Sequence, residues 1–208
     1  MTPDQIEALF TRSDGAFACA RWGRPIAPIV FGVDDATLEI VKGAIEAVVT
    51  LANHQMAETD PELGANLMMF FFLDWDELTE VPDLNRLVPD LVPLVDKLKT
   101  QGANQYRFFR FDESGAIKAS FVFLRMDEEL SAVPAETLAL SQIVQTILLW
   151  SDMAFRDASP LAAVPGSDMV ILRPDIAGVI RAAYDPVLPP LAQDPAHALR
   201  LSARLAQT

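Results

Sequence analysis

The sequence predicts an α+β fold, a mixed sheet with packed helices, in a single domain spanning residues 1–208. Strand-like segments cluster in a strand-rich front, residues 1–127, and helical segments dominate a helical back, residues 134–208. Strands followed by helices are typical of this fold class. A chain of 208 residues, of which 51% are hydrophobic, can also build one proper core.

The front begins with a helix expected from Pro3 to about Arg12. Thr2 supplies a hydroxyl cap and Gln5 completes a capping box. Residues 25–32 follow as a short strand, and the prolines within it indicate a position at the sheet edge.

Three further elements of the front have clear signals. Asp34 or Asp35 caps a patterned helix that runs through Asn53. The segment 67–73 (LMMFFFL) is apolar throughout, as expected of a strand buried on both faces. A helical stretch covers 91–99, and a hairpin turn at 112–115 joins strands over 106–112 and 116–126.

The helical back is expected to contain three helices. Pro134 opens a long helix that runs to about Ser151, and a second covers 174–184. Asp194 caps the last helix, with Pro195 at its first position.

The charge of the chain limits its partners. A formal net charge of −13 disfavours nucleic acid, because phosphate backbones repel such a surface. Acidic residues are densest at Asp74, Asp76, Glu77, Glu80 and Asp83, which fits a solvated helix start and leaves a basic partner or a divalent cation as the alternative. No apolar run reaches the roughly 20 residues that cross a bilayer, and no secretory signal is present, so we expect a cytoplasmic protein without membrane contact.

Few residues are suited to catalysis. Cys19 is the only cysteine and reads as a small core residue, so no intramolecular disulfide can form. His54 and His197 lie on different expected helices and read as surface or capping residues. Neither a glycine-rich phosphate loop nor a G-x-S-x-G elbow occurs, and we predict no cofactor and no metal.

Residues 141–152 (SQIVQTILLWSD) carry the most informative pattern. When the segment is aligned with the pattern H-E-x-x-H-x-x-G-x-x-H, Ser141 occupies the position of the first histidine and Gln142 that of the general base. Gln145 stands at the second histidine, Leu148 at the glycine and Ser151 at the third histidine. Serine and glutamine are neutral, and Gln142 has no carboxylate that could take a proton from water.

The following segments extend this pattern. Ser167-Asp168-Met169 is similar to a Met-turn, and 175–180 followed by Tyr184 is similar to a matrixin closing helix. Together the segments over residues 136–186 resemble the core of a metzincin protease, and a looser match of layout reaches back to about Trp22. Residues 145–152 and 184–186 also resemble an uncharacterised bacterial family.

This resemblance implies a zincin-like architecture that lacks every metal ligand. The function it implies is that of a non-catalytic pseudoprotease domain that binds a protein or peptide. Ser141, Gln142, Gln145, Ser151, Met169 and Tyr184 are then the candidate ligand-binding residues of the degenerate cleft.

Three alternatives stay open. An ordinary buried helix accounts for the same apolar residues. A hydrolase could use an unrecognised site of Asp or Glu carboxylates, with or without a metal. An acidic structural or assembly protein would expose a large apolar patch or form a homodimer. The sequence leaves the oligomeric state open.

Overall fold

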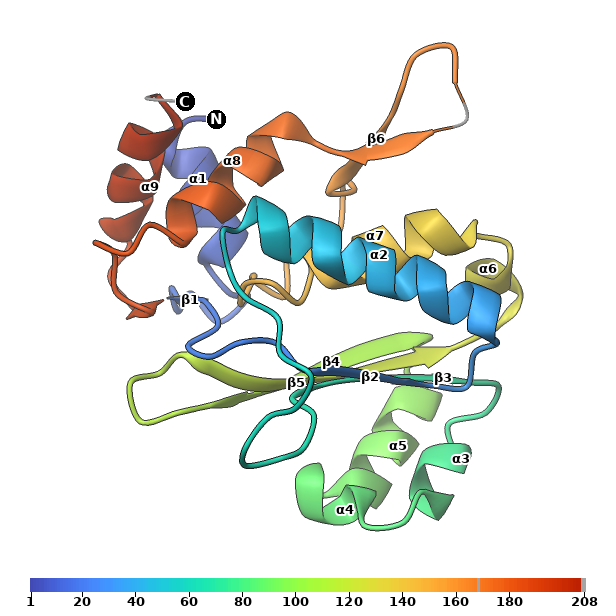
Figure 1. Cartoon of the computed structure of the whole chain (residues 1–208). Helices are drawn as coiled ribbons and strands as arrows, with labels where there is room; N and C mark the ends of the chain where they lie inside the picture. The colour runs from blue at the N-terminus through green and yellow to red at the C-terminus, as the bar shows by residue number, and fades with distance from the viewer. Residues whose placement is uncertain (168, 207–208) are drawn as a thin grey trace.

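A four-stranded mixed sheet forms the centre of the computed structural model, which describes residues 1–167 and 169–206. The strand order is β2-β3-β5-β4, with β2, β3 and β5 parallel and β4 antiparallel to β5 (Figure 1). The prediction of an α+β fold with a mixed sheet is therefore confirmed.

The strands are β1 (Cys19–Ala20), β2 (Pro28–Phe31), β3 (Leu67–Phe72), β4 (Gln105–Phe111), β5 (Ile117–Arg125), β6 (Leu161–Ala163), β7 (Val170–Leu172) and β8 (Leu191–Ala192). The helices are α1 (Pro3–Phe10), α2 (Asp35–Leu51), α3 (Glu77–Glu80), α4 (Leu84–Leu87), α5 (Leu91–Thr100), α6 (Glu128–Ser131), α7 (Ala135–Val144), α8 (Pro174–Ala183) and α9 (His197–Leu205).

One face of the sheet is covered by α2 and α7, which pack against each other (Figure 1). Asp34 caps α2 as predicted, because its carboxylate accepts the Thr37 N–H at 2.8 Å. Apolar side chains of α2 and α7 point down onto the sheet and form the larger core of the molecule. The C-terminal turn of α7 lies against β4, where Gln142 bonds to Arg107 and Gln105.

The opposite face is covered by α3, α4 and α5 (Figure 1). All six residues of β3 are buried, as predicted for this strand. Met69 and Phe71 belong to the core under α2 and α7, while Phe70 and Phe72 belong to a second core against the short helices. The alternation follows from the period of two along a strand.

The long helix predicted to reach Ser151 is shorter than predicted, because α7 ends at Val144. Contacts with other parts of the chain take the place of the helical turn that was predicted after Val144. The Trp150 indole donates to the Val144 carbonyl at 2.8 Å, and the Leu149 N–H donates to the Ala20 carbonyl at 2.9 Å. These bonds satisfy backbone groups that a continuing helix would have paired.

The rest of the helical back also differs from prediction. It contains the short strands β6, β7 and β8 in addition to its helices. The final helix begins at His197, because the Asp194 carboxylate holds a turn by accepting the Ala196 N–H at 2.9 Å. Helices α1, α8 and α9 gather at one end of the molecule (Figure 1). Among the helices of the described residues, none combines the length and apolar character that a bilayer span requires.

Candidate functional site

Four of the predicted cleft residues line two neighbouring cavities beside the C-terminal end of α7. The first, which we call the α7 cavity, has a volume of about 340 Å³ and is lined by Ser141, Gln142 and Gln145 together with residues 155–161. The second, which we call the β4 groove, has a volume of about 540 Å³ and lies between β4 and residues 149–156, which include Ser151. Gln145 lines both cavities, so the two form one continuous candidate site.

Ser141 and Gln145 lie on the same side of α7, as their spacing of four residues predicts. The Gln145 side-chain amide donates to the Ser141 hydroxyl at 3.0 Å. Gln142 is directed elsewhere. It is only 2% exposed and points beneath α7 toward β4.

Ser151 and Tyr184 have structural hydrogen bonds. The Ser151 hydroxyl donates to the Thr11 carbonyl at 2.6 Å and thereby joins the 151–156 loop to the end of α1. The Tyr184 hydroxyl donates to the Ile147 carbonyl at 2.8 Å. Burial raises the pKa of Tyr184, so its phenol stays neutral and serves to brace the segment after α7.

Met169 is not part of the site. It is 63% exposed, lies between β6 and β7, and its backbone carbonyl accepts the Val164 N–H at 2.9 Å. The middle residue of the proposed Met-turn, Asp168, lies outside the described residues. The structure thus brings together Ser141, Gln142, Gln145 and Ser151, and leaves Met169 and Tyr184 apart from the two cavities.

The central polar group of the site is Arg107, on β4. Its Nη2 donates to the Gln142 side-chain oxygen at 2.6 Å and to the Gln105 side-chain oxygen at 3.1 Å. Gln142 also donates from its amide nitrogen to the Gln105 oxygen at 3.1 Å. The three side chains therefore close a triangle between β4 and α7, in which two neutral amides hold one guanidinium.

Arg107 has no carboxylate partner within residues 1–167 and 169–206. Its Nε is buried and makes no hydrogen bond, and none of the ion pairs formed by the described residues includes it. Burial lowers the pKa of Arg107 to about 10, and no neighbouring acid acts to raise it. The guanidinium is still charged at neutral pH, so it is a cation that is partly desolvated without a counter-charge.

Two further arginines line the β4 groove. Arg12 and Arg156 are exposed at its rim, and Asp152 is the carboxylate that lines it with them. Asp152 is engaged by Ser13, whose N–H and hydroxyl donate to it at 2.9 and 2.5 Å. The groove is therefore locally positive on a chain whose formal net charge is −13.

The groove follows the outer edge of β4. The Asn104 carbonyl accepts the Arg125 N–H at 2.8 Å, and hydrogen-bonded pairs alternate along an antiparallel ladder. Gln105, Arg107 and Phe109 consequently direct their backbone N–H and C=O groups away from β5. Within the described part of the chain, no other element forms backbone hydrogen bonds with these outward groups.

Phe155 lies where the two cavities meet and has an unusual backbone. Its φ of 64° is in the left-handed region, which costs a non-glycine residue free energy. Its ring packs edge-on against Trp150 with the centroids 5.1 Å apart, and Trp150 in turn stacks on Phe10. These aromatic contacts hold the 151–156 loop in the conformation that forms the groove wall.

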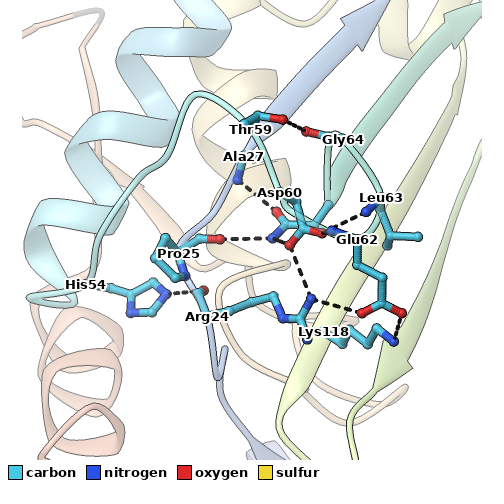
Figure 2. A network of polar contacts seen from close by, with 11 residues as sticks. Arg24, Pro25, Ala27, His54, Thr59, Asp60, Glu62, Leu63, Gly64 and Lys118 are labelled. Atoms are coloured by element: carbon cyan, nitrogen blue, oxygen red, sulfur yellow. Dashed lines mark hydrogen bonds and ion pairs between the residues drawn. The ribbon is translucent and has the colours of Figure 1, made fainter.

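A different polar network, around Asp60, fastens the loop before β3 (Figure 2). The Asp60 carboxylate accepts the N–H groups of Glu62 and Leu63 at 2.9 and 2.8 Å, and also the Arg24 guanidinium at 3.3 Å. Asn66 donates to the same carboxylate at 3.1 Å and accepts the Ala27 N–H at 2.8 Å. Burial acts to raise the pKa of Asp60, but these donors outweigh it and the net pKa is lowered.

This network does not resemble a catalytic centre. Asp60 lines a cavity of about 570 Å³ with Glu62 and Asp112, yet its oxygens are already used by the loop and by Arg24. Among the described residues, no group of three or more His, Cys, Asp or Glu side chains could hold a metal ion. The network acts as a structural joint between residues 55–66 and the first parallel strand.

The remaining candidates from the sequence lie apart from the groove. Cys19 is buried in the core as predicted, and burial raises its pKa to about 12. The expectation of a surface position for His197 is wrong, because its side chain, at the first residue of α9, is buried. His54 is half-buried, and its Nε2 is 2.9 Å from the Arg24 carbonyl. The acidic residues within 74–83 are exposed, as predicted, and extend from the start of α3 to the start of α4.

Arg107 and Gln105 are not among the residues predicted from the sequence. In β4 they alternate with Tyr106 and Phe108, a pattern that indicates a solvent-facing row on a sheet edge. Their role depends on Gln142, which is 35 positions away from Arg107 in the sequence. An arginine on an edge strand is a weak signal by itself, since charged residues also protect edges from unwanted pairing.

The site and fold together define an α+β domain with an arginine-lined groove along the open edge of a mixed sheet. Comparisons of the chain with protein-family models, with curated proteins and with solved structures found no match.

Proposed function

We propose that the chain is a non-catalytic peptide-binding domain, and that an extended peptide binds in the β4 groove as an additional strand. The observation that carries the proposal is the row of outward N–H and C=O groups at Gln105, Arg107 and Phe109, which line a groove of about 540 Å³. Peptides commonly bind by adding a strand to such an edge, where backbone hydrogen bonds supply affinity and adjacent pockets supply specificity.

The polar residues of α7 support a binding role without catalysis. Ser141 and Gln145 bond to each other, and Gln142 bonds to Gln105 and Arg107. Amides and an unactivated hydroxyl offer hydrogen bonds to a ligand, but they provide no general base near neutral pH.

We also propose that this domain is a zincin-like pseudoprotease, as the metzincin resemblance implies. Three features support the proposal: the order strand, long helix, strands and motif helix; the packing of α2 and α7 on one face of the sheet; and the end of α7 directly at Gln145. The position of Ser141, Gln142 and Gln145 in a cavity that is also lined by Gln105 of β4 supports the link between the two proposals.

Strand addition can be tested with peptides selected on the purified chain from a displayed library of random sequences. A selected peptide is then resynthesised in two forms, with backbone N-methyl groups on alternate residues of either one set or the other. Only one set of N–H groups in an added strand faces β4. We expect one form to lose binding and the other to retain it.

Nuclear magnetic resonance provides the second readout. Amide exchange at Gln105, Arg107 and Phe109 should slow when the peptide is bound, because their N–H groups become paired. The proposal fails if the library yields no binder, or if both N-methylated forms bind as the parent peptide does.

A further inference from the structure

The guanidinium of Arg107 has unused hydrogen-bonding capacity that faces the β4 groove. Nη2 supplies both of its hydrogen bonds, to Gln142 and Gln105. Nε forms none, but it is enclosed and out of reach of the groove. Nη1 forms none with the described residues and is not among their enclosed unpaired atoms, so its N–H groups remain for a group that enters the groove.

The two amides that hold Arg107 orient it without neutralising it. Gln142 and Gln105 accept hydrogen bonds, but neither carries a negative charge. Taking a cation out of water is costly, and proteins normally compensate for it with a paired anion. The two acids that line the cavities form no ion pair with Arg107: Asp152 accepts hydrogen bonds from Ser13, and Asp157 lines the α7 cavity without bonding to the guanidinium.

We propose that Arg107 receives a carboxylate of the peptide bound in the β4 groove, so that the ligand provides the counter-charge that the chain lacks. This inference rests on the proposed function, because it concerns the same groove. Arg12 and Arg156 extend the positive region at the rim and favour the approach of the same group. The ligand class is therefore a carboxylate-bearing peptide, with either an acidic side chain or a free C-terminus.

The charge of the site favours a carboxylate over a phosphate. A carboxylate with one negative charge matches a single half-buried guanidinium, and it can accept a charge-assisted hydrogen bond from Nη1. A phosphate carries more charge and would also meet Asp152 in the groove and a chain with a net charge of −13.

Three capped probes can separate the possible sources of the carboxylate. N-acetyl-Ala-Glu-Ala-amide offers a side-chain carboxylate, N-acetyl-Ala-Gln-Ala with a free C-terminus offers a terminal one, and N-acetyl-Ala-Gln-Ala-amide offers none. Binding is followed by the nuclear magnetic resonance signal of the Arg107 Nε–H. We expect at least one acidic probe to bind about tenfold more tightly than the neutral probe, since a charge-assisted hydrogen bond contributes more than a neutral one.

The substitution Gln142→Glu tests the same idea from the protein side. It keeps the shape of the side chain and places a carboxylate at the position that already accepts from Arg107 at 2.6 Å, while it removes the amide hydrogen bond from Gln142 to Gln105. We expect the affinity for the acidic probe to fall about tenfold, because Arg107 is then neutralised from within. Gln193→Glu adds the same charge at an exposed position outside both cavities, and it should leave the affinity unchanged.

Two results would overturn the inference. One is equal binding of acidic and neutral probes; the other is an acidic probe whose affinity is the same in Gln142→Glu and the parent chain. Stronger displacement of the probe by inorganic phosphate than by acetate would instead assign the site to phosphate. Strand addition is judged separately by the N-methylated peptides, so a neutral peptide that binds as a strand would retain the proposed function while removing this inference.

Discussion

Arg24 and Arg107 are two partly buried arginines in very different surroundings. Arg24 bonds to the carboxylates of Asp60 and Glu62, each at 3.3 Å, and its side chain is 28% exposed (Figure 2). Burial acts to lower its pKa, but the two acids outweigh this effect and the pKa is raised. Arg107 has only amide partners, and burial lowers its pKa to about 10.

The difference shows how one residue type serves two purposes. The Arg24 network satisfies its charges internally, and its hydrogen bonds hold the 55–66 loop against the sheet. Arg107 is oriented by its hydrogen bonds to Gln142 and Gln105, but no described residue neutralises its charge. A buried cation that is paired with an acid of the same chain helps to hold the fold together. A buried cation without such a partner can instead gain free energy when a bound ligand supplies the negative charge.

The largest effect that distinguishes the two regions is expected from Asp60→Ala. Removal of the Asp60 carboxylate leaves Arg24 and the N–H groups of Glu62 and Leu63 without their acceptor. We expect a loss of about 3 kcal/mol in the free energy of unfolding, measured by urea denaturation. Glu62→Ala is the matched control and should lose clearly less, since that side chain is 51% exposed and its ion pair with Arg24 is screened by solvent. Equal losses in the two variants would contradict the assignment of Asp60 as the centre of the network.

The next effect has the opposite sign. Arg107→Met removes a cation that is partly desolvated without a counter-charge, but it also leaves the buried Gln142 oxygen without its donor. Because an unpaired cation costs more to desolvate than a neutral amide oxygen, the free energy of unfolding should rise, by no more than about 1 kcal/mol. The same variant should lose affinity for the acidic probe. Arg110→Met, on the same strand, is the control and should change stability by no more than about 0.5 kcal/mol. A destabilised Arg107→Met would indicate that the guanidinium serves mainly to hold β4 to α7.

The smallest effect concerns pH. Burial lowers the pKa of His54, so the folded chain binds this proton more weakly than the unfolded chain does. Its contribution to stability is therefore complete above the unfolded-state pKa of about 6.5 and falls as the pH drops below that value. His54→Gln should reduce the loss of stability between about pH 7.5 and about pH 5.5. An unchanged pH profile would show that another group, such as the buried His197, accounts for the loss.

Most of the fold could be predicted because its signals are local. The apolar run of β3, the Asp34 cap of α2 and the hairpin turn at 112–115 each depend on residues that are close in sequence. The end of α7 could not be predicted in this way. Trp150 and Leu149 bond to Val144 and Ala20, so the helix ends because of contacts across the molecule.

The candidate site was only partly predictable for the same reason. The position of Gln142 and Gln145 on the last turn of α7 follows from helical spacing, and both residues do line a cavity. The partner of Gln142 does not follow from it, because Arg107 reaches α7 only through the order of strands in the sheet. Met169 was predicted to belong to the site because its place in the sequence resembles a Met-turn. In the structure it is exposed and lies apart from the site.

The amide of Gln142 beside Arg107 also has a genetic consequence. Codons for glutamine and glutamate differ at a single base, and the two side chains have nearly the same shape. A single base change could therefore place a carboxylate beside Arg107 with little change in side-chain volume, and its reversal would restore the amide. For the proposed site, loss and gain of the acidic ligand would then each require only one base change.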